Sequence, residues 1–542
     1  MCAPESKGHP TVPGFREVFR AYEVCRRRKR SRPDAIRFEM RALDETWALT
    51  SRIASGRYSP SRSVCFVARG AKPREVYAAA FRDRVVHHLL VSALEPFFER
   101  RFIADSFACR RHKGTHKATS RLSRFLRAAT DNGRVRAYAL KLDIRNFFPT
   151  IDKNVLWGVV ERRTRRFRHP YRDTVLGLLR TVVFHDPTKA FFLACPESEL
   201  ARVPPHKRLG AFGPDRGLPI GNLTSQFLAN CLLDELDQYV KRTLKVRWYL
   251  RYVDDMILVS RDPDSLRAWA VQIERFLRDH LHLELNQDAT RLFPVSRGVD
   301  CLGYVVRPHY TLVRRRVVGH LRARLTALGH RLLKTDGRIL QCNVAAAREA
   351  GLVSSLNSYL GHFRHARTAN TLAGVMADYP WVRWFVEFRM DRKGHRVAQD
   401  RFAPPRSFRC LRDQWSFFRF VLQGHELLPP GERPVLFVRI GRFYEMFEED
   451  AAFGVGVLGL RDLEPRKGFR RRCGFRKDRL DVFVGKAVEV GRVVAVVEET
   501  GRPLGRVQQR FLDSIYRRFD HEEDLLGIAG IVRRVGAGHP GR

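Results

Sequence analysis

The sequence is poor in acidic residues relative to basic ones, and it has no long hydrophobic run. Its 542 residues contain 58 Asp and Glu against 100 Lys and Arg, a formal net charge of +42. An excess this large argues against a metabolic enzyme of small molecules and indicates a polyanionic partner, whose phosphates supply much of the binding energy. The first twelve residues lack the apolar core of a signal peptide, and no later run is long enough to cross a membrane. We therefore expect a soluble, cytoplasmic protein with no membrane partner.

Paired cysteines are also lacking. The 10 Cys residues are scattered without a Cys-x-x-Cys pair, which disfavours both a zinc ribbon and a disulfide framework and favours reduced thiols. Hydrophobic residues make up 44% of the chain and Phe alone numbers 37, so packed cores are expected rather than a basic disordered tail. A chain of this length is expected to form more than one domain.

Two adjacent aspartates inside an apolar run are the most informative feature of the chain. Residues 248–259 read Trp-Tyr-Leu-Arg-Tyr-Val-Asp-Asp-Met-Ile-Leu-Val, which predicts two strands of a hairpin with Asp254 and Asp255 at or beside the turn. Two like charges side by side repel each other and resist desolvation, and a bound divalent cation compensates both effects. The pair alone is equally compatible with an ordinary Asp-containing turn.

A second acidic strand favours the catalytic interpretation. In residues 136–144, alternation places the apolar side chains on one face of a strand and Asp143 on the other. A nucleotide polymerase needs a few carboxylates from separate strands that converge on two metal ions flanking an in-line phosphoryl transfer. We therefore predict that Asp143, Asp254 and Asp255 are catalytic and bind two Mg²⁺ ions.

These motifs resemble those of reverse transcriptases and follow in that family's order. Residues 252–255 (Tyr-Val-Asp-Asp) resemble the metal-binding motif, and residues 142–148 (Leu-Asp-Ile-Arg-Asn-Phe-Phe) resemble the first palm motif. The other similar blocks are the fingers segment 106–114, the block 217–222 under the nascent base pair, and the last two palm motifs at 285–286 and 301–304. The resemblance covers roughly residues 20–400. It implies an α+β right-hand polymerase with fingers, an antiparallel-sheet palm with helices on one face, and a helical thumb.

The resemblance also implies roles around the incoming nucleotide. Arg110 and Lys113 would contact the triphosphate of the dNTP, Arg through paired hydrogen bonds and Lys as a point charge. Phe148 matches the position at which an aromatic ring excludes a ribose 2′-hydroxyl. The motif at 285–286 is usually followed by a Lys, regarded as a general acid for the pyrophosphate leaving group. Here residues 287–289 are Gln, Asp and Ala, and Arg291 is a candidate replacement.

A more specific match lies in the segment Ile220-Gly221-Asn222-Leu223-Thr224-Ser225-Gln226, which resembles reverse transcriptases of diversity-generating retroelements. Most other reverse transcriptases carry a Gln where this chain has Ile220, and an aliphatic side chain cannot make the hydrogen bond of that Gln near the nucleotide. One such bond contributes on the order of 1 kcal/mol. A packed core role for Ile220 is the alternative.

Such elements copy a template RNA into cDNA with errors concentrated at template adenines, and the cDNA is then transferred into a target gene. The resemblance therefore implies an error-prone RNA-directed DNA polymerase whose partners are dNTPs, template RNA, cDNA and target DNA. It leaves open whether a separate accessory subunit is used. A retron- or defence-type reverse transcriptase is the alternative within the enzyme class. A non-catalytic RNA-binding scaffold is the alternative outside it, and the three retained aspartates disfavour it.

The C-terminal part resembles the N-terminal mismatch-recognition domain of MutS, over residues 434–500. The Phe-x-Glu motif of that domain would be Phe443-Tyr444-Glu445. In MutS the Phe stacks on an unpaired base and the Glu accepts a hydrogen bond from it, and stacking on a base contributes about 1–3 kcal/mol. Arg442 replaces an acidic residue usual in that motif, and no phosphate-binding loop of the MutS ATPase occurs in the sequence. The resemblance implies a small α/β nucleic-acid-binding domain, with Phe443 as a buried core residue as the alternative.

The organisation predicted from these features has five parts. They are a basic N-terminal segment at 1–34, fingers and palm at 35–310, a helical thumb at 311–400, a Pro-containing linker at 401–433, and the MutS-like domain at 434–542. Apolar residues repeat at steps of three and four from Val318 to Leu332, which predicts a thumb helix with one buried stripe. The stretch 161–217 is expected to be an insertion of loop and helix with no catalytic role.

Overall fold

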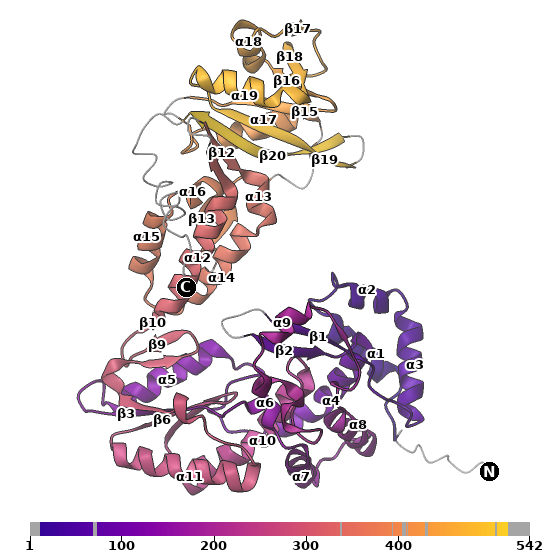
Figure 1. Ribbon diagram of the computed structural model, residues 1–542, viewed down its shortest axis with the longest axis vertical. Coiled ribbons are helices and arrows are strands. Elements are labelled where there is room, and N and C mark those ends of the chain that lie inside the picture. The colour runs from indigo at the N-terminus through magenta and orange to yellow at the C-terminus, as the bar shows by residue number, and fades with distance from the viewer. Residues whose placement is uncertain are drawn as a thin grey trace, which may run out of the picture. The chain divides into compact units, whose positions relative to one another are not determined.

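The computed structural model describes residues 11–68, 73–335, 339–392, 394–403, 408, 410–428, 432–504 and 507–518. It divides into two compact units, Met1–Tyr310 and Thr311–Arg542, both drawn in Figure 1. Parts of three predicted segments lie outside the described residues: the N-terminal decapeptide, the Pro-Pro pairs of the predicted linker, and the last 24 residues, 519–542.

The first unit contains the sheets of the predicted palm and fingers and the helices that pack around them. Its elements, in chain order, are α1 (Phe15–Arg26), α2 (Pro33–Glu39), α3 (Ala42–Ala54), β1 (Ser63–Ala68), β2 (Arg74–Ala78), α4 (Phe81–Glu99), α5 (Thr115–Ala129), β3 (Tyr138–Leu142), α6 (Phe147–Thr150), α7 (Lys153–Thr164), α8 (Arg172–Phe184), β4 (Phe191–Leu193), α9 (Glu197–Ala201), η1 (Pro205–Lys207), η2 (Leu209–Phe212), α10 (Leu223–Gln238), η3 (Tyr239–Thr243), β5 (Trp248–Tyr252), β6 (Asp255–Ser260), α11 (Pro263–Leu281), η4 (Gln287–Ala289), β7 (Arg291–Pro294), η5 (Val295–Arg297), β8 (Val299–Cys301) and β9 (Tyr304–Val306).

A four-stranded antiparallel sheet in the order β5-β6-β3-β7 lies in the predicted palm. The alternating, β-branched segments predicted as strands form β3, β5 and β6, and the predicted hairpin turn falls at Val253 and Asp254. Leu142, the last residue of β3, lies opposite Met256, the second residue of β6. The register therefore brings Asp143, which directly follows β3, next to the β5–β6 turn.

Helices cover both faces of the palm sheet. Leu140 and Leu258 share one hydrophobic core with residues of α10 and α11. On the other face, Ala139 and Val259 are also buried, and α5 contacts β5 and β6. Figure 1 shows α5 and α11 on opposite sides of β3 and β6. The expectation of helices on one face only is therefore wrong, because the amphipathic helix α5 buries its apolar stripe on the second face.

The fingers contain a second sheet, in the order β2-β1-β4. β1 pairs antiparallel with β2 and parallel with β4. Strand β4 comes from the stretch 161–217, so this stretch adds a strand to the sheet of β1 and β2, besides the expected loop and helix. Val18, Tyr22 and Cys25 of α1 are buried in the core shared with α4, so the basic N-terminal segment also belongs to this unit's core.

The second unit is built around one long sheet with helices on both faces. Its elements are β10 (Thr311–Val313), α12 (Arg315–Leu332), β11 (Leu333–Thr335), β12 (Ile339–Asn343), α13 (Val344–Glu349), α14 (Leu352–Phe363), α15 (Ala369–Asp378), α16 (Val382–Phe385), β13 (Val386–Met390), β14 (Arg396–Asp400), α17 (Leu411–Leu422), β15 (Val435–Ile440), β16 (Phe443–Phe447), α18 (Glu449–Gly456), β17 (Asp462–Leu463), β18 (Arg472–Arg476), η6 (Lys477–Arg479), α19 (Leu480–Glu489), β19 (Val494–Leu504) and β20 (Val507–Arg518).

The predicted thumb and the predicted C-terminal domain share this sheet. Its eight strands follow the order β11-β12-β20-β19-β15-β16-β18-β17, and the first two come from the thumb segment. β12 pairs antiparallel with β20, from Ile339 opposite Arg518 to Asn343 opposite Ser514. The sequence boundary at 434 therefore does not coincide with a boundary between compact units.

The two faces of this sheet carry different helices. Leu436 and Val438 of β15 pack into a core with the thumb helices and α17, whereas Val435 and Phe437 pack into a second core with α18 and α19. The predicted thumb helix is present as α12, with a buried stripe at Leu321, Leu325, Leu328 and Leu332. Helix α17 lies inside the predicted linker, and its Phe418 and Leu422 are buried. That part of the linker is therefore an element of the core.

No helix within the described residues combines the length and the apolar character that crossing a membrane requires.

Candidate active site

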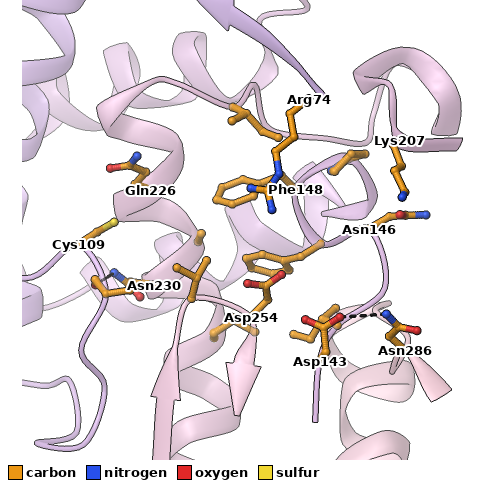
Figure 2. Close-up of a pocket in the computed structure, with 18 of the residues that line it drawn as sticks. Arg74, Cys109, Asp143, Asn146, Phe148, Lys207, Gln226, Asn230, Asp254 and Asn286 are labelled. Atoms are coloured by element: carbon orange, nitrogen blue, oxygen red, sulfur yellow. Dashed lines mark hydrogen bonds between the residues drawn. The ribbon is translucent and has the colours of Figure 1, made fainter. Parts of the chain in front are cut away.

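A cavity of about 460 Å³ lies at the acidic end of the palm sheet (Figure 2). It is lined by Asp143, Asp254, Phe148 and Ile220, which are all predicted site residues. Asp143, after β3, and Phe148, in α6, are near each other in sequence, whereas Asp254 in the β5–β6 turn and Ile220 before α10 come from more distant parts of the chain. The structure therefore brings two of the three predicted acids, the predicted steric gate and one predicted nucleotide contact to one place.

A buried arginine holds the turn that carries Asp254. Val253 has φ 55°, a left-handed conformation that is rare for a β-branched residue. The guanidinium of Arg251 donates a hydrogen bond to the Val253 carbonyl at 2.9 Å, and it forms a buried ion pair with Asp237 of α10 at 2.7 Å. The strained turn is therefore fixed from beneath by α10.

Asn286 orients the other acid. Its Nδ2 donates to Oδ2 of Asp143 at 3.0 Å, drawn dashed in Figure 2, and its backbone N–H donates to the Asp143 carbonyl at 2.8 Å. Asn286 also lines the cavity. The motif at 285–286 thus holds the carboxylate of Asp143.

The electrostatics of the two acids fit a divalent cation. Burial, and then the negative charge of Asp143, raise the pKa of Asp254 to about 6, while the charge of Arg74 acts in the opposite direction. Carboxylates that repel each other in a partly enclosed cavity are the oxygen donors that Mg²⁺ prefers. Among the described residues, no three His, Cys, Asp or Glu side chains cluster closely enough to hold a metal ion. The side chains that the structure brings to the cavity are thus Asp143 and Asp254.

Asp255 has a different neighbour. It is the first residue of β6, and its carboxylate forms a salt bridge with Lys141 of β3 at 3.1 Å. It does not line the catalytic cavity. Its part in metal binding stays a prediction.

The predicted triphosphate contacts Arg110 and Lys113 do not line the cavity either. Arg110 is buried and makes an ion pair with Glu99 of α4 at 2.7 Å. Its guanidinium also donates to the carbonyls of Ile103 and Ser106. Lys113 donates to the Ala104 carbonyl at 2.7 Å. These side chains stabilise the loop before α5, so the structure does not support their predicted contact with the nucleotide.

Two cations that the sequence analysis missed line the cavity instead. Arg74 begins β2, and Lys207 ends η1. In Figure 2 their side chains reach into the cavity from above, while Asp143 and Asp254 approach from below. Lys207 lies in the stretch 161–217, for which no catalytic role was expected.

The block around Ile220 is fixed against β2. Gly221 has φ 108°, and a Cβ at this position would come within 2.8 Å of Cγ1 of Val76. The next residue, Asn222, accepts a hydrogen bond from the backbone N–H of Ala79 at 3.2 Å. Ile220 itself is half-buried and faces the cavity as a lining residue. It therefore forms part of the cavity wall, and its role toward the nucleotide stays a prediction.

The C-terminal motif is only partly exposed. Phe443 begins β16 with 48% of its surface exposed, so the alternative of a buried core Phe does not hold. Glu445 is buried and ion-paired with Arg466 at 3.3 Å and Arg472 at 3.2 Å. The aromatic ring is therefore available to a ligand, while the carboxylate is engaged by two guanidinium groups.

Comparison with known families assigns both parts of the chain. Residues 69–306 match the reverse transcriptase (RNA-dependent DNA polymerase) family, and residues 421–518 match MutS domain I. Protein YkfC of Escherichia coli (strain K12) is 25% identical over 301 residues, which is 49% of this chain and 72% of that protein.

Two mismatch-repair proteins match the C-terminal part. DNA mismatch repair protein MSH6 of Arabidopsis thaliana is 40% identical over 76 residues, 14% of this chain and 6% of that protein. DNA mismatch repair protein MutS of Parabacteroides distasonis is 33% identical over 72 residues, 13% of this chain and 8% of that protein. This chain therefore shares one small segment with these much longer proteins.

Solved telomerases resemble the chain weakly. The telomerase of Candida albicans, in complex with a TWJ fragment of telomeric RNA, is 10% identical and covers 53% of this chain and 55% of its own, with a TM-score of 0.34. The apo telomerase of Candida tropicalis, truncated from its C-terminal domain, is 11% identical and covers 49% of this chain and 59% of its own, also with a TM-score of 0.34. Scores this low add nothing to the sequence match. The family matches therefore indicate an RNA-directed DNA polymerase in which residues 69–306 are similar to reverse transcriptases and residues 421–518 are similar to MutS domain I.

Proposed function

We propose that this polymerase makes error-prone cDNA from a template RNA in a diversity-generating retroelement, with errors concentrated opposite template adenines. The observation that carries the proposal is the place of Ile220, a wall of the catalytic cavity inside the segment 220–226 that resembles this class. A retron- or defence-type enzyme that copies faithfully is the second candidate.

In the proposed mechanism, Asp143 and Asp254 would hold two Mg²⁺ ions, which would supply Lewis-acid chemistry for phosphoryl transfer. Asn286 keeps the carboxylate of Asp143 turned toward the cavity through the 3.0 Å hydrogen bond. Phe148 lines the same cavity, and its ring would exclude nucleotides that carry a 2′-hydroxyl. The salt bridge of Asp255 with Lys141 would open if Asp255 joins the metal ligands.

Ile220 lowers fidelity in this proposal because it offers no hydrogen bond. A polar side chain at this position would form a hydrogen bond with the nucleotide and would stabilise a correctly paired nucleotide more than an incorrectly paired one. An aliphatic wall gives the same contact to correct and incorrect pairs. The lost bond is worth about 1 kcal/mol, which corresponds to roughly a fivefold loss of discrimination.

The C-terminal sheet would hold nucleic acid beside its exposed Phe443. A cDNA paired with a target gene necessarily contains mismatches, and Phe443 could stack on a base at such a position. Glu445 is occupied by Arg466 and Arg472, and Arg442 stands where an acid is usual. We infer that stacking and attraction to phosphates dominate binding, with a weaker contribution from the carboxylate.

The test is the error spectrum of cDNA made by the full chain on a defined RNA template with Mg²⁺. Ile220→Gln should lower misincorporation opposite template adenine by about fivefold. Ile220→Val keeps an aliphatic wall and should leave the spectrum unchanged. Equal adenine errors in the wild type and Ile220→Gln would show that infidelity arises elsewhere. Faithful copying by the wild type would favour the retron- or defence-type candidate.

A further inference from the structure

Two unassigned cations face the catalytic acids across the cavity, and one of them comes from a stretch with no expected role. We propose that Lys207, together with Arg74, binds the triphosphate tail of the incoming dNTP and the pyrophosphate that leaves. This assignment rests on the polymerase activity of the same cavity and does not depend on its fidelity.

Other cations near the site are already engaged. Arg251 lines the cavity but is buried in its ion pair with Asp237, and Lys141 is paired with Asp255. Arg291, the candidate replacement for the usual Lys, donates to the Thr290 carbonyl and does not line the cavity. Within the described part of the chain, the cavity-lining cations without a salt bridge are therefore Arg74 and Lys207.

A buried hydrogen bond holds these two cations on one side of the cavity. The carboxylate of Glu75, next to Arg74, accepts a hydrogen bond from the backbone N–H of Leu209 at 2.8 Å, across 134 residues of sequence. Tyr77 donates a further hydrogen bond to Glu75 at 3.3 Å. Leu209 lies two residues after Lys207, so the contact ties the loop that carries Lys207 to strand β2. Because the Glu75 carboxylate is buried and accepts this hydrogen bond, it fixes the position of the loop relative to β2.

The same loop is locked against the block under the nascent base pair. A Cβ at Gly217 would come within 2.8 Å of Cδ1 of Leu209 and 3.1 Å of the Pro149 carbonyl. The backbone N–H of Lys207 donates to the Pro204 carbonyl at 2.9 Å. Lys207 thus projects from a loop whose two ends are fixed, whereas its ammonium is exposed.

The chemistry of the reaction explains what this arrangement supplies. The primer 3′-oxygen, its proton released to solvent, forms a bond to the α-phosphorus. The bond from that phosphorus to the bridging oxygen of the β-phosphate breaks, and its electron pair leaves with pyrophosphate. Negative charge therefore accumulates on the side of the triphosphate away from the primer. An ammonium and a guanidinium placed there stabilise this charge, and their positions are set before the nucleotide arrives.

The test compares Lys207→Ala and Lys207→Arg with the wild-type full chain in single-nucleotide extension of a defined primer on an RNA template. The quantities measured are kcat and KM for the dNTP, the inhibition constant of inorganic pyrophosphate, and the Kd for the primer–template. Lys207→Ala should raise KM and the pyrophosphate inhibition constant by about tenfold or more, since a charged hydrogen bond is lost. The Kd for the primer–template should stay unchanged, and Lys207→Arg should restore most of both constants.

Two further variants separate this role from general charge and from folding. Lys189→Ala removes an exposed Lys of the same stretch that lies outside the catalytic cavity, and it should behave as the wild type. Glu75→Ala should raise KM for the dNTP partway toward Lys207→Ala, because it frees Leu209, whereas Glu75→Gln keeps an oxygen acceptor and should not.

Unchanged KM and pyrophosphate inhibition in Lys207→Ala, with active wild type, would overturn the assignment. So would equal defects in Lys207→Ala and Lys189→Ala. Lack of cDNA synthesis by the wild type would instead contradict the polymerase activity on which the assignment rests.

Discussion

Replacing Phe443 with Ala separates a base-stacking role from a packing role, because the same strand offers a matched control. Phe443 begins β16 and is 48% exposed. Phe447 ends the strand on the same face, is fully buried, and stacks on Phe469 with ring centroids 4.0 Å apart. The two substitutions remove the same atoms from one strand, so their different effects report the environment of each ring.

The expected magnitudes follow from that difference in burial. Full burial of a Phe side chain is worth about 1.5–3 kcal/mol, so a ring that is half exposed contributes on the order of 1 kcal/mol. Phe447→Ala leaves a cavity in the core and should cost about 3–5 kcal/mol of unfolding free energy. If Phe443 stacks on a base, its removal should weaken binding by about 1–3 kcal/mol, which is roughly five- to 150-fold in Kd.

The assay needs a ligand that the polymerase cavity cannot use. A dumbbell DNA, closed by loops at both ends and carrying one mismatch, has no primer terminus. Its Kd for the full chain is measured at low salt, alongside thermal unfolding of each variant. Phe443→Ala should lose affinity with a shift in Tm of no more than about 4 °C, at roughly 2–4 °C per kcal/mol for a unit of this size.

Two results would refute this reasoning. A loss of stability in Phe443→Ala as large as that in Phe447→Ala would show that the ring packs rather than stacks. An unchanged Kd in Phe443→Ala at wild-type stability would show that the exposed ring contacts no base, and a protein-docking role would then be favoured.

Two further predictions concern the first unit. Asp254→Asn should abolish Mg²⁺-dependent cDNA synthesis while RNA binding persists, since the Lys and Arg residues that would contact phosphates remain. Asp255→Asn should retain more activity, because the Asp255 carboxylate is paired with Lys141. Equal loss of activity in both variants would show that Asp255 is an equal metal ligand. The second prediction concerns His87. Its burial, and then the nearby charge of His88, lower the pKa of its imidazole to about 3. An unfolded His titrates near 6.5, so between these values the unfolded chain binds the extra proton and stability falls as pH falls from about 7 toward 3. Urea unfolding from pH 7 to pH 4 should show this slope, and His87→Gln should flatten it; an identical slope in both proteins would assign the effect to other groups.

Local patterns were sufficient wherever a contact lies within one element or one turn. Alternation around Asp254 predicted the hairpin, and the steps of three and four from Leu321 to Leu332 predicted the buried stripe of α12. Both follow from the period of the backbone itself, because the side-chain direction along a strand or helix is fixed by geometry. The predicted cavity residues Phe148 and Ile220 were found differently, through the resemblance of their motifs to those of reverse transcriptases.

Charged side chains could not be assigned in this way. Arg110 lies in a motif that implies a triphosphate contact, yet its partner is Glu99, 11 residues earlier on α4. Whether a cation is free depends on which acids the fold brings near it, and a local motif does not contain that information. Lys207 shows the converse case. Nothing adjacent to it in sequence indicates that it lines the cavity, and its loop is tied to β2 by the hydrogen bond between Glu75 and Leu209, across 134 residues.

The boundary of the C-terminal domain has the same physical origin, and it changes how that domain can be studied. The sequence similarity is confined to the MutS-like segment, but the sheet of that segment continues into strands β12 and β11 of the predicted thumb. β12 of the thumb segment covers the edge of β20 over five residue pairs, and α17 fills the core beneath the sheet with Phe418 and Leu422. A fragment cut at 434 would expose the backbone groups of β20 and the apolar face of β15, which favours aggregation. Failure of such a fragment to bind nucleic acid would therefore say nothing about Phe443, and the full chain is the protein in which its role has to be measured.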